Sequence, residues 1–217
     1  RGRRGRIWHS EPNQTLTFSL AYPFHPNLSM QFFQGLSLAC GLGIIQGIAA
    51  YHNVPPALLA KGGLGLKWPN DLWLHGRKCG GLLIQLRGEA DGPCDVTLGF
   101  GINVHLSRQA GAGIDQDWAA LAEHTDAVLD RNRLLAGLLS ELTRGFERFE
   151  SDGLPAFIAD WRSLDGLQGR AVRVQDGAKQ RDGRACGITA DGALLFEDAE
   201  GRHLLHSGEV SVRVSHG

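Results

Sequence analysis

The sequence predicts an α+β fold, in which a mixed or antiparallel sheet with helices is followed by a small β-barrel. Residues 65–104 hold consecutive extended runs joined by short turns, which favours antiparallel pairing over repeated βαβ units. Residues 131–150 carry apolar side chains at helical spacing. From about residue 167, short apolar runs alternate with Asp-Gly turns, a pattern typical of a barrel of short strands. We therefore expect one domain over residues 1–165 and a second over residues 166–217.

The composition indicates a globular protein and argues against several other classes. The 217 residues are 42% hydrophobic and 21% charged, which suits one good core with a small satellite domain. The formal net charge is −1, so the molecule as a whole does not resemble a polyanion binder. Four cysteines without close pairs argue against a disulfide framework or a zinc site and favour the cytoplasm. His203 and His206 lack a third ligand at metal-site spacing, so no metal ligand is predicted.

The first part of the chain predicts a strand and a long helix. Residues 16–22 alternate apolar and polar side chains and end at Pro23, which indicates a strand. A helix is expected over residues 29–52, and Pro55 prevents its continuation. Its residues 35–51 are apolar but too short for a membrane span, so we expect a buried core helix. Small side chains on this helix favour close packing of another element: Gly35, Ala39, Gly43 and Gly47.

The remaining elements follow in order. Strands are expected at residues 65–68, 72–74, 78–86 and 96–104, with a hairpin turn at 75–77 and a loop at 88–95, and a short helix is expected at 57–61. Helices are expected at 119–123, 131–150 and 154–162, and Asp130 or Asn132 can cap the longest. The final strands are expected within 171–174, 185–188, 193–197 and 210–214, with turns at 176–177, 182–183 and 191–192.

The opening stretch Arg1-Gly2-Arg3-Arg4-Gly5-Arg6-Ile7-Trp8 concentrates the positive charge of the chain. Glycine lets main-chain N–H groups approach a ligand, arginine suits carboxylate and phosphate, and tryptophan offers a face to an aromatic base. A solvated basic tail is the alternative for such a terminus. The sequence begins inside this run without an initiator Met, so we expect that residues upstream are missing.

Three further motifs point to the same kind of ligand. Lys67-Trp68-Pro69-Asn70-Asp71 places an amine, an amide and a carboxylate around a proline corner. Lys78-x-x-Gly81 opens a strand with a lysine that can reach an anion. Gly99-x-Gly101-x-Asn103 begins like a dinucleotide fingerprint, but Val104 and the lack of a following helix exclude that fold. No P-loop sequence occurs either.

In order and spacing, these four motifs and residues 208–213 resemble the biotin–protein ligase family, the biotin–[acetyl-CoA-carboxylase] ligases. The resemblance implies a class II aminoacyl-tRNA-synthetase-like sheet with helices, followed by an SH3-like β-barrel. It implies that biotin attacks the α-phosphate of MgATP to give biotinyl-5′-AMP, and that a lysine of a biotin carboxyl carrier protein then takes the biotin. Biotin is thus a substrate, with ATP and Mg²⁺ as the other small molecules.

The same resemblance implies roles for individual residues. Catalytic roles fall on Lys78, Asp71 and Arg3. The residues expected to bind biotin are Arg1, Gly2, Arg3, Lys78, Gly80 and Gly81. The residues expected to bind ATP or the adenylate are Arg4, Arg6, Trp8, Asn70, Asn103, Glu209 and Arg213. Asp71 is expected to orient or deprotonate the incoming amine.

Some features depart from the family or leave alternatives open. The Ser/Thr-rich stretch and the Gln that hold the ureido ring would precede Arg1, and Gln85 stands where many members carry an acidic residue. A winged-helix DNA-binding domain would also precede Arg1, and a homodimer through a sheet edge is possible in this family. Two other functions remain as alternatives: a lipoate or octanoate ligase of the same superfamily, and an arginine-rich regulator that binds nucleic acid.

Overall fold

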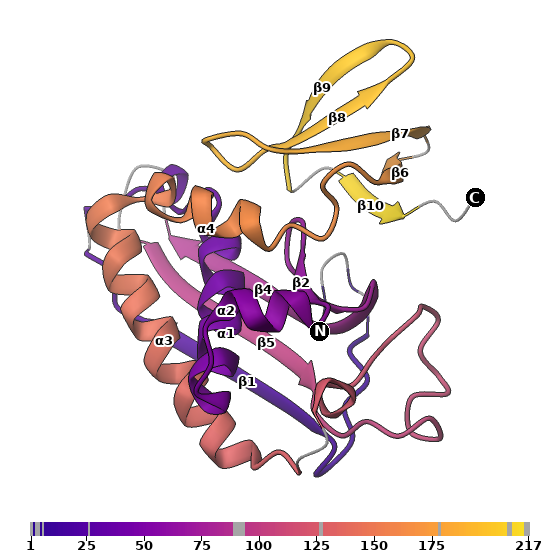
Figure 1. The fold of residues 1–217 in the computed structure, drawn as a ribbon. Coiled ribbons are helices and arrows are strands. Elements are labelled where there is room, and N and C mark those ends of the chain that lie inside the picture. The colour runs from indigo at the N-terminus through magenta and orange to yellow at the C-terminus, as the bar shows by residue number, and fades with distance from the viewer. Residues whose placement is uncertain are drawn as a thin grey trace.

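The computed structural model describes residues 2, 5, 7–25, 27–88, 94–125, 128–177, 179–207 and 210–214. These residues form two antiparallel sheets of five strands each, and helices lie beside the first sheet (Figure 1). The predicted α+β class is therefore confirmed, with sheets that are antiparallel throughout. No helix of the described residues is long and apolar enough to cross a membrane.

The first sheet follows the predicted run of strands. Its order is β1 (Thr15–Tyr22), β5 (Cys94–Asn103), β4 (Arg77–Gly88), β3 (Asp71–Leu74) and β2 (Leu64–Lys67). The expected hairpin turn joins β3 to β4 through His75 and Gly76, whose φ angles are 51° and 78°. Two consecutive left-handed residues make the two-residue turn whose twist matches the flanking strands. Strand β4 is longer than expected and extends beyond the end of β3.

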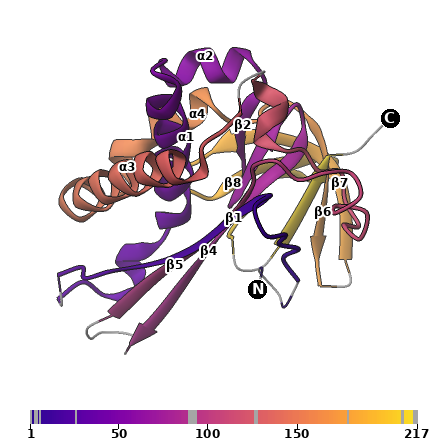
Figure 2. The same cartoon turned by 90° about the horizontal axis from the view of Figure 1, so that it is seen from below.

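Two long helices, α1 (Leu36–His52) and α3 (Arg131–Asp152), pack together on one face of this sheet (Figures 1 and 2). Glycines make the crossing close, as predicted. A Cβ on Gly47 would lie 2.7 Å from Cα of Leu138, and one on Gly43 would lie 3.3 Å from Leu142. The carboxylate of Asp130 caps α3 by accepting from the main-chain N–H groups of Asn132 and Arg133.

The long helix expected over residues 29–52 is interrupted. A short 3₁₀ turn, Met30–Phe33, is separated from α1 by Gly35, whose φ is 79°. The Leu154 side chain fills the space beside Gly35, where a Cβ would come within 2.4 Å of it. This left-handed residue turns the chain around Leu154, a contact from a distant part of the sequence that no local pattern could reveal.

The other helices are short. Helix α2 spans Pro56–Lys61, and α4 spans Ile158–Ser163 after a 3₁₀ turn at Leu154–Phe157. The helix expected at 119–123 is a 3₁₀ turn at Leu121–His124. Leu164, Leu167 and Trp161 are buried where the chain leaves α4 for the second sheet, so the two sheets share a continuous apolar core.

The second sheet has the order β10 (Val210–Val214), β6 (Ala171–Asp176), β7 (Lys179–Ile188), β8 (Leu194–Asp198) and β9 (Gly201–Leu205). One predicted turn is wrong: Asp182 and Gly183 lie inside β7. There Asp182 pairs across the strands with Arg173, and Gly183 leaves room for the Phe196 ring. The predicted turn at Asp191–Gly192 is confirmed by the positive φ of Gly192 and its position between β7 and β8. Strand β9 was not expected.

Candidate active site

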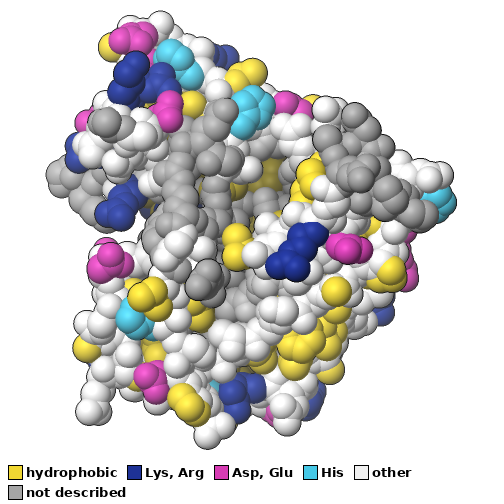
Figure 3. Space-filling view, turned by 180° about the vertical axis from the view of Figure 1, so that it is seen from behind, with side chains coloured by type: hydrophobic (Ala, Val, Ile, Leu, Met, Phe, Trp, Pro, Cys, Tyr) yellow, Lys and Arg dark blue, Asp and Glu magenta, His cyan; other side chains and the backbone are white. Residues whose placement is uncertain are grey.

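A cavity of about 1830 Å³ opens on the face of the first sheet that α1 does not cover. The side chain of Leu82 on β4 packs toward Gly41 of α1, and the neighbouring Gly81 and Leu83 are on the side of the cavity. This follows from the alternation of side chains along a strand. The loop at 106–118 and strand β10 of the second sheet complete the lining. On the face seen in Figure 3, the described Lys and Arg side chains are interspersed with Asp and Glu.

The proline corner brings its polar groups to this cavity, as the sequence predicts. The Trp68–Pro69 peptide is cis, and the buried Trp68 indole donates its N–H to the carbonyl of Gly192 at 3.0 Å, which ties the corner to the second sheet. The Asn70 side-chain amide donates to the carbonyl of Leu82, and the main-chain carbonyl of Asn70 accepts from the N–H of Leu82. Asn70 therefore fixes the corner to β4.

Lys78 points into the cavity because β4 carries a bulge. Trp73 of β3 pairs with Lys78 and Leu72 with Gly80, so Cys79 is an extra residue without a partner on β3. The bulge puts Lys78 on the same side of the strand as Gly81, over which its side chain lies at 3.3 Å from the Cβ position. The thiol of Cys79 faces the core, where burial raises its pKa to about 12.

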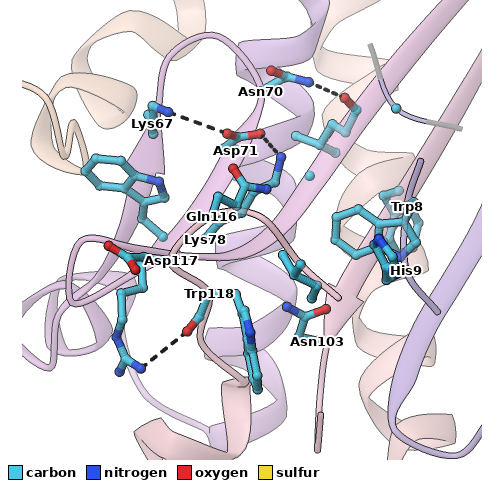
Figure 4. Close-up of a pocket in the computed structure, with 18 of the residues that line it drawn as sticks. Trp8, His9, Lys67, Asn70, Asp71, Lys78, Asn103, Gln116, Asp117 and Trp118 are labelled. Atoms are coloured by element: carbon cyan, nitrogen blue, oxygen red, sulfur yellow. Dashed lines mark hydrogen bonds and ion pairs between the residues drawn. The ribbon is translucent and has the colours of Figure 1, made fainter. Parts of the chain in front are cut away.

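Asp71 lies between two lysines. Its Oδ1 is 2.8 Å from Nζ of Lys78, and its Oδ2 is 3.8 Å from Nζ of Lys67 (Figure 4). All three side chains are less than one-fifth exposed. Lys67 was not among the predicted site residues, although it belongs to the motif that drew attention to this corner.

A glycine floor, formed by Gly81, Gly99 and Gly101, lies beside Lys78. In the register of the sheet Gly101 stands between Gly81 and Thr17. The Trp8 ring occupies the space above Gly101, where a Cβ would come within 2.4 Å of the indole. Nζ of Lys78 lies 5.9 Å from the centre of the same ring.

The structure does not bring the predicted biotin-binding residue Gly80 to the cavity. Its Cβ position faces Leu72 and the carbonyl oxygen of Gly101, at 3.3 and 2.9 Å. Gly80 is therefore required for the close approach of β4 to β3 and β5. The bulge explains the displacement, because it places Gly81 instead of Gly80 on the side of Lys78.

Two buried polar atoms at the cavity have no hydrogen-bond partner among the described residues: Oδ1 of Asn103 and Nε1 of Trp8. The amide nitrogen of Asn103 donates to the carbonyl of Ala119 at 3.2 Å, so its oxygen is left on the side of Trp8 and His9 in Figure 4. Buried polar groups are normally paired, and leaving one unpaired costs about 1–3 kcal/mol. A ligand with a matching donor and acceptor would satisfy both.

Residues 117–123 pair with the start of β4 and are called the clasp below; the sequence did not indicate this feature. The N–H of Lys78 donates to the carbonyl of Asp117, and the carbonyl of Lys78 accepts from the N–H of Ala119, each at 3.0 Å. Arg77 and Glu123 form an ion pair at 2.8 Å across the same junction. Burial alone would raise the pKa of Glu123, but the Ala120 N–H and Arg77 hold it below its ordinary value.

The other predicted residues fall into two groups. Gly2 and the exposed Arg213 line the cavity, and Gln85 lies on the same sheet face, two residues beyond Leu83 on β4. Five predicted residues lie outside the described part of the chain: Arg1, Arg3, Arg4, Arg6 and Glu209. His203 lies with Asp198 and Glu200 at the β8–β9 turn, but Asp198 already pairs with His203 and Arg181.

Comparison with known proteins identifies the family to which the chain is related. Residues 1–103 match the Biotin/lipoate A/B protein ligase family, and residues 168–213 match the Biotin protein ligase C terminal domain. A biotin protein ligase from Aquifex aeolicus, solved with biotin and ATP, is 26% identical. The match has a TM-score of 0.76 and covers 99% of this chain and 84% of that one.

Curated relatives extend the likeness along the chain. The bifunctional ligase/repressor of Escherichia coli is 36% identical over 98% of this chain, which spans 63% of the length of that relative. The biotin–[acetyl-CoA-carboxylase] ligase of Mycobacterium tuberculosis is 33% identical over 97% of this chain and 74% of its own length. The matches cover both the sheet that carries Lys78 and the C-terminal strands, and the chain belongs to the biotin protein ligase family.

Proposed function

We propose that this protein activates biotin with ATP to biotinyl-5′-AMP and transfers the biotin to a lysine of a biotin carboxyl carrier protein. The observation that carries the proposal is the pair Lys78–Asp71 over a glycine floor, in a cavity large enough for biotin and a nucleotide together. The relative from Aquifex aeolicus with biotin and ATP bound supports the choice of both substrates.

In the first step, a carboxylate oxygen of biotin attacks the α-phosphorus of ATP and pyrophosphate leaves. Two anions must meet, and negative charge grows on the phosphoryl oxygens in the transition state. The ammonium of Lys78, held in place by Asp71, is positioned to contact both the carboxylate and the phosphate. Gly81 lets the biotin chain lie against β4, and the resemblance adds Arg1, Gly2 and Arg3 as residues that close over biotin.

We propose that the adenine is bound beside Asn103 and Trp8. The exocyclic amine of adenine can donate to Oδ1 of Asn103, which is 3% exposed and otherwise without a partner among the described residues. The indole of Trp8 offers an N–H and an aromatic face on the same side of the cavity. The remaining nucleotide contacts are proposed from the family resemblance: Arg4, Arg6, Asn70, Glu209 and Arg213.

In the second step, the carrier lysine attacks the carbonyl carbon of the mixed anhydride and AMP leaves. Asp71 lies next to Lys78, so its carboxylate can receive and orient the incoming amine. A closed cavity is needed to keep water from the anhydride, and the loop at 106–118 already covers one side.

Mg²⁺ is proposed to arrive with ATP and to neutralise part of the polyphosphate charge. Mg²⁺ prefers oxygen ligands and keeps several waters. Asp115 and Asp117 line the cavity and supply carboxylates of this kind, whereas Asp71 is already shared by two lysines. The donors present therefore fit an ion held mainly by phosphate and water, and no dedicated metal ligand is assigned.

Three further proposals concern the whole protein. We propose a catalytic domain at 1–165 and an SH3-like domain at 166–217, supported by the second family match at 168–213 and by β6, which begins at Ala171. A homodimer through the sheet edge is proposed at β4, whose pairing with β3 ends at Gly81 while the strand runs to Gly88. We place the protein in the cytoplasm, with DNA binding only if a winged-helix domain precedes this sequence.

Pyrophosphate exchange tests the proposed function and separates it from its closest alternative. The purified protein is incubated with ATP, labelled pyrophosphate and either biotin, lipoate or octanoate. We expect exchange that depends on biotin and is absent with the other two acids. Exchange with lipoate or octanoate alone would show the related ligase activity instead. No exchange with any acid, in protein that is folded by circular dichroism, would contradict the proposal.

A further inference from the structure

Lys67 is a charged side chain beside Asp71 to which the proposed reaction assigns no role. Its Nζ lies 3.8 Å from Oδ2 of Asp71 and 5.2 Å from the centre of the Trp73 ring, and its side chain is 14% exposed. The residues stand at opposing positions of the β2–β3 hairpin, Lys67 facing Asp71 across the pair. The hairpin and the aromatic ring therefore hold a second ammonium beside the carboxylate that Lys78 already occupies.

This arrangement bears on the second step of the proposed reaction, in which the amine of the carrier lysine attacks the adenylate. A lysine amine has an ordinary pKa near 10.4, so it reaches the enzyme mostly as an ammonium, which cannot attack. An isolated carboxylate next to it would stabilise the ammonium and slow the attack. Asp71 is not isolated, because two lysines share it. During transfer the phosphate of the adenylate offsets the charge of Lys78, and Lys67 offsets the charge of Asp71, so an amine that comes among them does not meet an uncompensated carboxylate that would hold it as an ammonium.

We propose that Lys67 activates the acceptor amine by electrostatic repulsion, lowering its pKa at the site while Asp71 orients it; this inference rests on the proposed function. The acceptor enters as an ammonium and loses one proton to solvent. Its nitrogen then forms a bond to the acyl carbon, the bond from that carbon to the phosphate oxygen breaks, and AMP leaves with the electron pair. A second proton leaves the nitrogen to solvent, which gives a neutral amide.

The place of Lys67 beside Asp71 and Trp73 suits it to act on the acceptor amine. Lys78 contacts Oδ1 of Asp71 and is placed to hold the acyl carbonyl and the phosphate of the adenylate, so the incoming amine meets Asp71 on the Oδ2 side, where Lys67 lies. The Trp73 ring, over which the guanidinium of Arg170 also lies at 5.9 Å, favours a cation at this point. A lysine whose Nζ lies 3.8 Å from Oδ2 is near enough to act electrostatically on an amine bound to that oxygen.

The size of the effect follows from charge and distance. A unit charge several ångströms away in a partly solvated site shifts a pKa by about one unit. Removing Lys67 should therefore move the rise of the transfer rate with pH upward by about one pH unit. The wild-type protein and a Lys67 variant share all the other charged side chains that line the cavity, so the effects of these side chains on the pKa of the amine cancel when the two proteins are compared. These side chains are Arg77, Arg108, Asp115, Asp117, Glu123, Arg170 and Arg213.

The test measures the second step alone in Lys67→Met, Lys67→Gln and Lys67→Arg. Each protein is loaded with synthetic biotinyl-5′-AMP and mixed with a recombinant biotin carboxyl carrier domain at pH 6.5 to 9.5. We expect transfer by Lys67→Met and Lys67→Gln to be about tenfold slower than wild type near pH 7, and to converge with it at high pH. Lys67→Arg keeps the charge and should restore the wild-type profile. Lys61→Met, on the exposed end of α2 outside the cavity, is the matched control and should not shift it.

A second nucleophile separates the charge effect from a loss of geometry. Hydroxylamine is already neutral near pH 7, so its reaction with the bound adenylate should be equal in wild type and Lys67→Met. The inference would be overturned if the variant transferred biotin more slowly than wild type by the same factor at every pH. It would also be overturned if the rate with hydroxylamine fell as much as the rate with the carrier lysine. If the wild-type protein shows no biotin-dependent exchange, the proposed function itself fails, which is a different result from an unchanged pH profile in an active enzyme.

Discussion

Replacing Gly101 with alanine tests whether the Trp8 indole is part of the site. Gly101 faces the cavity on β5, and a Cβ there would lie 2.4, 2.6 and 2.7 Å from three atoms of the Trp8 ring. Its φ is not in the left-handed region, so alanine is compatible with the backbone. The three atoms nearest to the new Cβ all belong to the indole, so the substitution should act by displacing the indole from the glycine floor.

The expected loss can be worked out from that contact. Ordinary contacts of a Cβ begin at 3.4 Å, so the ring must move by about 1 Å. Misplacing a group in an active site by this distance costs up to about 100-fold in rate. Because Trp8 lies beside Lys78, we expect biotin-dependent pyrophosphate exchange to fall about 10- to 100-fold, equal to about 1.4–2.8 kcal/mol in the barrier.

The assay combines exchange kinetics with tryptophan fluorescence, which should report the displaced indole. Gly145→Ala is the matched control, since Gly145 lies in α3 and a Cβ there meets no atom within 4 Å apart from its chain neighbours and the helix backbone. This variant should retain wild-type exchange. Exchange by Gly101→Ala within twofold of wild type would refute the conclusion that the position of Trp8 matters to the reaction.

Two predictions concern stability. Asp130→Ala removes the cap of α3 and should lower the free energy of unfolding by about 1 kcal/mol, seen as a melting temperature lower by about 2–4 °C; an unchanged melting curve would contradict it. Burial raises the pKa of Asp165 to about 6, above its ordinary 3.8, and Oδ2 has no partner among the described residues. A raised pKa favours the protonated form in the folded state, so stability should fall as pH rises from about 4 to 6, by at most about 3 kcal/mol. Asp165→Asn should remove that pH dependence in urea titrations; the same dependence in the variant would rule out Asp165 as its source.

Local sequence features were sufficient to predict much of the fold. The turn at His75–Gly76, the cap at Asp130 and the close-packing glycines of α1 are each read from a few neighbouring residues. The Lys67–Asp71 corner and Lys78 were identified from their motifs, and the sheet brings them within hydrogen-bond or ion-pair distance. The link between them is the β3–β4 hairpin, which the turn residues already indicated.

What could not be predicted depends on contacts between distant segments. The bulge at Cys79 decides that Gly81, and not Gly80, faces the cavity, and a bulge leaves no clear mark in the sequence. The clasp of residues 117–123 on the start of β4 pairs an irregular segment with a strand some 40 residues away in the chain. The break before α1 lies at the left-handed Gly35, whose side faces the distant Leu154.

The central claim is that Lys78 brings the biotin carboxylate and the α-phosphate together. The most direct test is single-turnover formation of biotinyl-5′-AMP by Lys78→Ala, with the fold checked by circular dichroism and thermal melting. Both side chains line the cavity and Asp71 keeps Lys67 as an ion-pair partner, so the variant should fold, while adenylate formation should fall by at least about 100-fold. Adenylate formation at the wild-type rate in folded Lys78→Ala would contradict the account.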